Sequence, residues 1–167
     1  MMYYVYIFYP INYVFAIHDS EPVMEAPLAT PDGLDEERLD DVVRAFYARV
    51  RGDDEIGPLF NAAIEDWDEH LDRLTRFWSS VMLTSGRYKG NPMAAHRRHA
   101  GAIAPAMFDR WLALWAEVTS ERLSGPAAAA LQHKAGHIAE SLKLGLFFKI
   151  PPSVSSPSRP SGEGDIA

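Results

Sequence analysis

The stretch DEERLDDVVRAFYARVRG (residues 35–52) repeats apolar side chains at intervals of three and four residues. This spacing places them on one face of an α-helix that begins at Asp35 and ends near Gly52. The acidic side chains of the first turn suit the positive end of the helix dipole. The predicted apolar face consists of Leu39, Val42, Val43, Phe46, Tyr47 and Val50.

Three more segments downstream show helical spacing. Asp66 and Glu69 have the separation of a capping box, and an apolar stripe follows them as far as Met82. A third long helix follows Pro105 with the stripe Phe108, Trp111, Leu112, Trp115 and Val118, and Pro126 opens a last helix. Residues 52–63 are expected to form a turn-rich connection. Because no segment alternates with a period of two and no repeat is visible, the predicted fold class is all-α.

Length and composition restrict the class of protein. A chain of 167 residues that is 47% apolar can build one sizeable core. With no cysteine, any metal must be held by histidine, carboxylate or tyrosine. A formal net charge of -7 argues against nucleic-acid binding, and we expect the basic pair Arg97 and Arg98 to be a solvated face. A cytoplasmic monomer is expected.

The two ends differ in composition from the middle. Residues 1–30 are expected to be an extension whose aromatic start is either upstream sequence read before an alternative start at Met24, or a membrane-surface anchor. The aromatic run is too short for a transmembrane segment. Residues 31–150 are expected to form the domain, and residues 151–167, rich in Pro, Ser and Gly, a disordered tail.

Three of the expected helices each bring a side chain with an apolar body and a polar tip to the inward stripe: Tyr47, His70 and Trp111. Their polar atoms could satisfy one another in an ordinary core, or they could surround a bound ligand. A histidine could face that ligand from GNPMAAHRRHAG (residues 90–101), where Asn91 can cap a short helix opened by Pro92. His96 and His99 are the two candidates in this stretch.

The chain resembles the group III truncated haemoglobins of bacteria from about Leu34 to Phe148. The resemblance is carried, in order, by FYARVRGDDEIGPLF (46–60), W-x-E-H (67–70), FWSSVML (77–83), RYKGNPMAAH (87–96) and FDRWLALW (108–115). Each motif alone is weak, but their order and spacing are specific. The resemblance implies a truncated globin, a two-over-two helical sandwich around haem b.

On this match His96, which ends the pattern Y-x-G-x-P-x-x-x-H, is the proximal iron ligand and His99 has no role in binding. Phe60 matches the phenylalanine that packs on the haem face. The match places Tyr47, His70 and Trp111 at distal positions that contact the bound ligand. Arg73, one turn past His70, could reach a haem propionate or could be a solvated arginine.

The family's implied function is reversible binding of O2 or another diatomic ligand at a five-coordinate iron. An NO- or peroxide-related redox activity, of the NO dioxygenase or peroxidase-like kind, would also need an electron donor that the sequence does not identify. The alternative is a haem-free helical module that binds another protein and whose aromatic residues are only core. His133 and His137, four residues apart, are expected to be a surface or structural pair rather than a zinc site.

Overall fold

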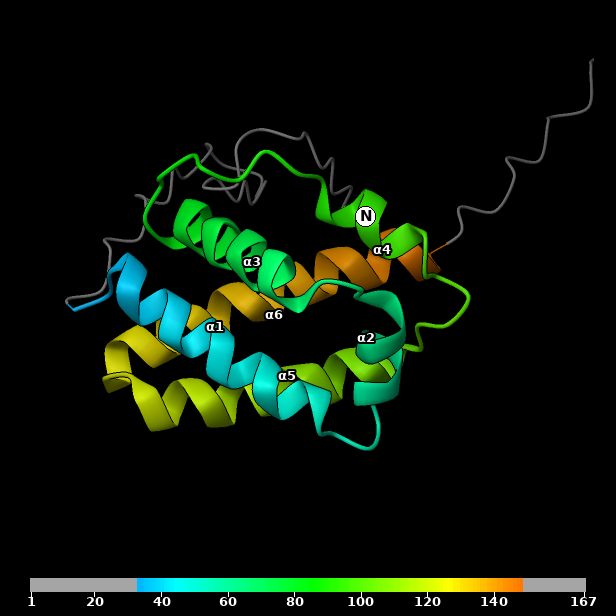
Figure 1. The fold of residues 1–167 in the computed structure, drawn as a ribbon, viewed down its shortest axis with the longest axis horizontal. Coiled ribbons are helices and arrows are strands. Elements are labelled where there is room, and N and C mark those ends of the chain that lie inside the picture. Colours follow the sequence, from blue (N-terminus) through cyan, green and yellow to red (C-terminus); the bar gives the residue numbers. More distant parts are fainter. Residues whose placement is uncertain (1–32, 149–167) are drawn as a thin grey trace, which may run out of the picture.

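The computed structural model describes residues 33–148, and every regular element in that range is a helix (Figure 1). The helices are α1 (Glu36–Arg51), α2 (Gly57–Ala63), α3 (Trp67–Met82), α4 (Pro92–Arg97), α5 (Pro105–Arg122) and α6 (Gly125–Phe147). The all-α prediction is confirmed. The expectations for residues 1–30, for the start at Met24 and for the tail 151–167 lie outside the described residues.

Local side-chain chemistry sets where the helices begin. Asp35 accepts a hydrogen bond from the Arg38 amide at 2.8 Å, and Asn91 accepts one from the Ala94 amide at 3.0 Å. Each bond satisfies an amide that has no partner within the helix. Asp66 caps α3 in the same way, but the Glu69 side chain pairs with Arg73 instead of returning to the cap. Prolines in the first turn open α2, α4, α5 and α6.

The expected connection over residues 52–63 is wrong in its second half, which forms α2. Asp53 accepts hydrogen bonds from the amides of Glu55 and Ile56, both at 3.0 Å, and so closes the preceding turn. Gly57 permits the tight approach of α2 to α1, because a Cβ there would lie 2.9 Å from the Val50 carbonyl oxygen. Seven residues are too few to display helical periodicity in a sequence.

The four long helices form two crossing pairs. α1 packs on α3, α5 packs along α6, and α1 crosses α5 to join the pairs, as Figure 1 shows. This is the expected two-over-two arrangement. α2 is packed on α1 and α4 on α6, so that the short helices flank the sandwich.

The core is centred on aromatic side chains from α1, α3 and α5. Trp115 is fully buried and stacks between Trp78, at a ring-centroid distance of 4.6 Å, and Trp111, at 5.7 Å. The expected α5 stripe is only partly correct, because Leu114 and Thr119 are buried while Trp111 and Leu112 are half-buried. α5 contacts both α1 and α6, so it buries more than one face.

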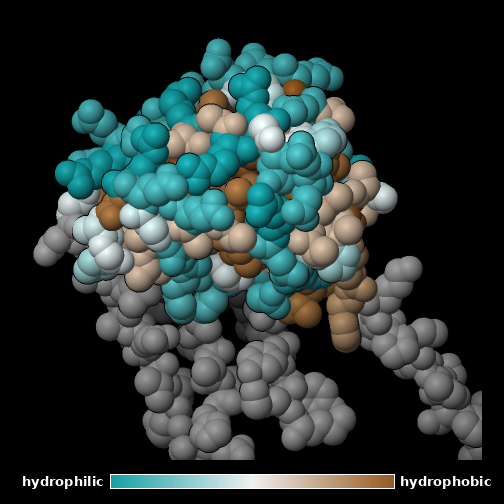
Figure 2. All heavy atoms as spheres, turned by 90° about the horizontal axis from the view of Figure 1, so that it is seen from below, coloured by the Kyte–Doolittle hydropathy of each residue, from teal (hydrophilic) through white to brown (hydrophobic). Residues whose placement is uncertain are grey.

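Exposed ion pairs connect α1 with α5. Arg49 bonds Glu121 at 2.9 Å, and Arg122 bonds Asp41 at 2.7 Å. Figure 2 shows hydrophilic residues over most of the face seen from below, with hydrophobic residues between them. Because exposed pairs contribute only about 0 to 1 kcal/mol each, the apolar core carries most of the packing energy. No helix among the described residues is long and apolar enough to cross a membrane.

Candidate functional site

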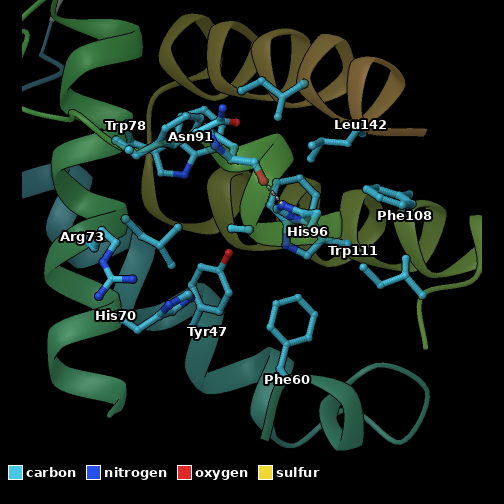
Figure 3. Close-up of a pocket in the computed structure, with 18 of the residues that line it drawn as sticks. Tyr47, Phe60, His70, Arg73, Trp78, Asn91, His96, Phe108, Trp111 and Leu142 are labelled. Carbon is cyan, nitrogen blue, oxygen red and sulfur yellow. Dashed lines mark hydrogen bonds between the residues drawn. The ribbon is translucent and has the colours of Figure 1, made fainter. Parts of the chain in front are cut away.

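A cavity of about 430 Å³ lies between the two helix pairs and reaches α2 and α4 (Figure 3). Its walls include all the candidate site residues of the sequence analysis, which are Tyr47, Phe60, His70, Arg73, His96 and Trp111. Residues from five helices that are far apart in the sequence therefore meet at one place. Cavities of about 300 to 1,000 Å³ are typical of small-molecule and cofactor sites.

His96 comes from α4, whose start is held by the Asn91 cap and by Pro92. The Nδ1 atom of His96 lies 2.8 Å from the Pro92 carbonyl oxygen, the bond drawn as a dashed line in Figure 3. A carbonyl can only accept, so Nδ1 carries the proton and donates. The other ring nitrogen, Nε2, keeps its lone pair, which is the form of imidazole that binds a metal. His99, by contrast, is exposed and does not line the cavity.

Tyr47 places a neutral hydroxyl in the cavity. Its residue is 4% exposed, and in Figure 3 its hydroxyl points toward the middle of the site. Burial raises the pKa of Tyr47 far above its ordinary value, and a hydrogen bond with the Trp111 side chain opposes that rise only in part. Because an indole N–H can only donate, the Tyr47 oxygen accepts from Trp111 and its own O–H proton is left to donate.

His70 and Phe60 pack around the Tyr47 ring. The His70 ring meets it edge-on at 5.9 Å, and the Phe60 ring lies at the same centroid distance. Burial lowers the pKa of His70, and the positive charge of Arg73 lowers it further. The imidazole is therefore held toward its neutral form, in which one ring nitrogen can donate a hydrogen bond and the other can accept one.

Two arginines of the described part of the chain line the cavity, and they differ in their surroundings. Arg73 forms an ion pair with Glu69 on the same helix and is half-exposed. Arg98, two residues after His96, also lines the cavity and is exposed to solvent. Sequence reasoning placed Arg98 on a solvated face and did not connect it with the site. Its position next to the end of the short helix that carries His96 is the signal that could have found it.

The chemistry of the walls fits haem better than a bare metal ion. No Asp or Glu of the described residues lines the cavity, so a hard cation would lack oxygen ligands there. Trp78, Phe108 and Leu142 supply apolar walls instead. The imidazoles of His70 and His96, within a largely apolar cavity, are a donor set suited to iron held in a macrocycle. His133 and His137, with rings 4.3 Å apart on α6, do not line the cavity.

Comparison with known proteins identifies the class to which this fold and cavity belong. Residues 33–139 match the family model of the bacterial-like globins, and the chain belongs to that family. The chain is similar to the group 3 truncated haemoglobin ctb of Campylobacter jejuni, with 33% identity over 88 residues, 50% of this chain and 68% of that protein. The crystal structure of a group III truncated haemoglobin from the same organism aligns with a TM-score of 0.63 at 27% identity, covering 70% of this chain and 94% of that one.

The globin fold and the resemblance to group III truncated haemoglobins are thus confirmed. Membership of the globin family implies haem-based binding of a diatomic ligand.

Proposed function

We propose that the protein reversibly binds O2 or another diatomic ligand at the iron of haem b, with His96 as the proximal ligand. The observation that carries this proposal is the bond between His96 Nδ1 and the Pro92 carbonyl, at the edge of a cavity that no Asp or Glu among residues 33–148 lines. This bond fixes the imidazole in the tautomer that presents Nε2 as a metal ligand. Haem, when bound, supplies an iron atom with an open coordination position for the diatomic ligand.

The side chains around Tyr47 would form the polar part of the ligand-binding position, with Phe60 packed on the macrocycle. A neutral tyrosine hydroxyl is a hydrogen-bond donor, and the Trp111 indole occupies the acceptor side of the Tyr47 oxygen. A donor held in an apolar cavity favours a ligand that becomes partly negative, such as O2, over the less polar CO. His70 would contribute a second, weaker donor.

The alternative, a haem-free helical module, requires side chains that fill the interior. A cavity of about 430 Å³ argues against it, because ordinary cores contain few voids larger than a water molecule. An NO- or peroxide-related redox activity would use the same donors and additionally require an external electron donor. No described side chain favours that activity over simple ligand binding.

The proposal is tested by haem titration of the purified protein followed by absorbance. The His96→Gly variant is expected to lose the Soret band of wild type, and added imidazole is expected to restore it, because free imidazole can occupy the vacated space. His99→Ala is the matched control, since that residue is exposed and does not line the cavity. A wild-type spectrum in His96→Gly would refute the assignment, as would loss of haem in His99→Ala.

A further inference from the structure

Positive charge is concentrated in one part of the chain. Residues 73–108 contain no Asp or Glu, although the whole protein has a formal net charge of -7. The basic residues of this part are Arg73, Arg76, Arg87, Lys89, Arg97 and Arg98. The same part contains α4 and about two thirds of the residues that line the cavity. The cavity is therefore bordered by a locally basic segment within an acidic protein.

Some of these cations are already neutralised by a partner. Arg73 pairs with Glu69, and Arg87 pairs with Glu36. Over residues 33–148, by contrast, the side chains of Arg97 and Arg98 have no ion pair, hydrogen bond or aromatic contact. Two adjacent guanidinium groups near His96 thus have no side-chain partner among the described residues.

Only one of these two arginines reaches the site. Arg98 lines the cavity, whereas Arg97 does not. Arg98 is the C-cap residue of α4, and its amide bonds the His96 carbonyl, so the backbone fixes its place relative to the proximal imidazole. Because Arg98 is also exposed, it stands where the cavity opens to solvent. An anionic group projecting from a ligand in the cavity would meet it there.

We propose that Arg98 binds a propionate carboxylate of the haem. This inference rests on the proposed function and adds a residue that the sequence analysis had assigned to a solvated face. A guanidinium matches a carboxylate with two parallel N–H donors, so it orients the macrocycle as well as attracting it. Arg73, which the sequence analysis considered for binding a propionate, would have to break its ion pair with Glu69 to bind one.

The test measures the rate of haem transfer from the protein to an excess of apomyoglobin. The same rate is then measured with haem dimethyl ester, in which both propionates are esterified and uncharged. Arg98→Gln is expected to release haem about two- to fivefold faster than wild type, the range of a solvent-exposed ion pair. The difference should shrink as salt is added. Release of the dimethyl ester should be the same in both proteins.

Arg97→Gln is the matched control, because it removes the same charge one residue away from the cavity wall, and it should release haem at the wild-type rate. Arg73→Gln should accelerate release less than Arg98→Gln. The proposal is overturned if Arg98→Gln leaves haem release unchanged, if it accelerates release of the ester equally, or if Arg73→Gln has the larger effect. Failure of the proposed function itself would look different, since neither haem nor its ester would then give a Soret band with any variant.

Discussion

Replacing Tyr47 by phenylalanine is expected to accelerate dissociation of O2. The change removes one hydroxyl from a residue that is 4% exposed and leaves its ring, and hence the contacts with Phe60 and His70, in place. The hydroxyl is neutral because burial raises the pKa of Tyr47 far above its ordinary value. It therefore acts as a donor at every pH from about 6 to 9.

The size of the expected change in the O2 dissociation rate depends on how many hydrogen-bond donors the cavity offers. A hydrogen bond to a partly charged acceptor contributes about 1.5 to 3 kcal/mol, and each 1.4 kcal/mol changes a rate about tenfold. Loss of the hydroxyl also releases the Trp111 N–H, which bonds Tyr47 in the native site and can then turn toward the ligand. We therefore expect about tenfold faster dissociation in Tyr47→Phe, and about a hundredfold in the double variant with Trp111→Phe.

Stopped-flow measurement of O2 and CO dissociation from the haem-loaded variants is the assay. CO should respond less than O2, and the effect on O2 should not vary between about pH 7 and 9, because the Tyr47 hydroxyl stays protonated there and burial lowers the pKa of the neighbouring His70. His70→Leu should have a smaller effect than Tyr47→Phe. If O2 left both Tyr47→Phe and the double variant at the wild-type rate, the polar group would be only a part of the core and the reasoning would fail.

Three further predictions concern stability. Gly57→Ala is expected to lower the free energy of unfolding by about 1 to 3 kcal/mol, because its Cβ would meet backbone carbonyls at the end of α1. The matched control is Gly136→Ala on α6, where the space is open, and thermal melting should show a gain of about 0.5 to 1 kcal/mol. Arg110 lowers the pKa of the Asp53 carboxyl, so this pair stabilises the fold at pH values above the unfolded-state pKa of Asp53. That stabilisation is lost as the pH falls through the lower pKa of the folded state. Asp53→Asn should therefore make the free energy of unfolding less dependent on pH at the acid end, and an unchanged pH dependence would contradict this. Removal of residues 1–23 should leave the haem spectrum and the melting temperature unchanged, since the family match begins at residue 33; a large fall in melting temperature would contradict this boundary.

Helical spacing and caps made most of the fold predictable from the sequence. Each long helix repeats its apolar residues over several turns, and Asp35, Asp66 and Asn91 cap the helices predicted to follow them. These signals are local, so they can be recognised without knowing which helices pack against each other. The short helix α2 was not predicted, because one or two turns are too short to display a helical period. Its position depends on the turn at Asp53 and on the close approach to α1 at Gly57.

The site residues could be nominated from the sequence, but their meeting depends on tertiary structure. His96, Tyr47 and Trp111 stood out as polar tips on apolar faces or after a cap, yet no spacing along the chain determines that six helices leave a cavity between them. Glu69 and Arg73 lie four residues apart on α3, so their pairing is a local contact that the spacing permits. Tertiary packing decides that Arg98 lines the cavity and has no such partner among residues 33–148. Periodicity depends on the geometry of one helix, whereas a cavity and its charges depend on side chains from several helices at once, and that is why only the folded chain shows that Arg98 reaches the site.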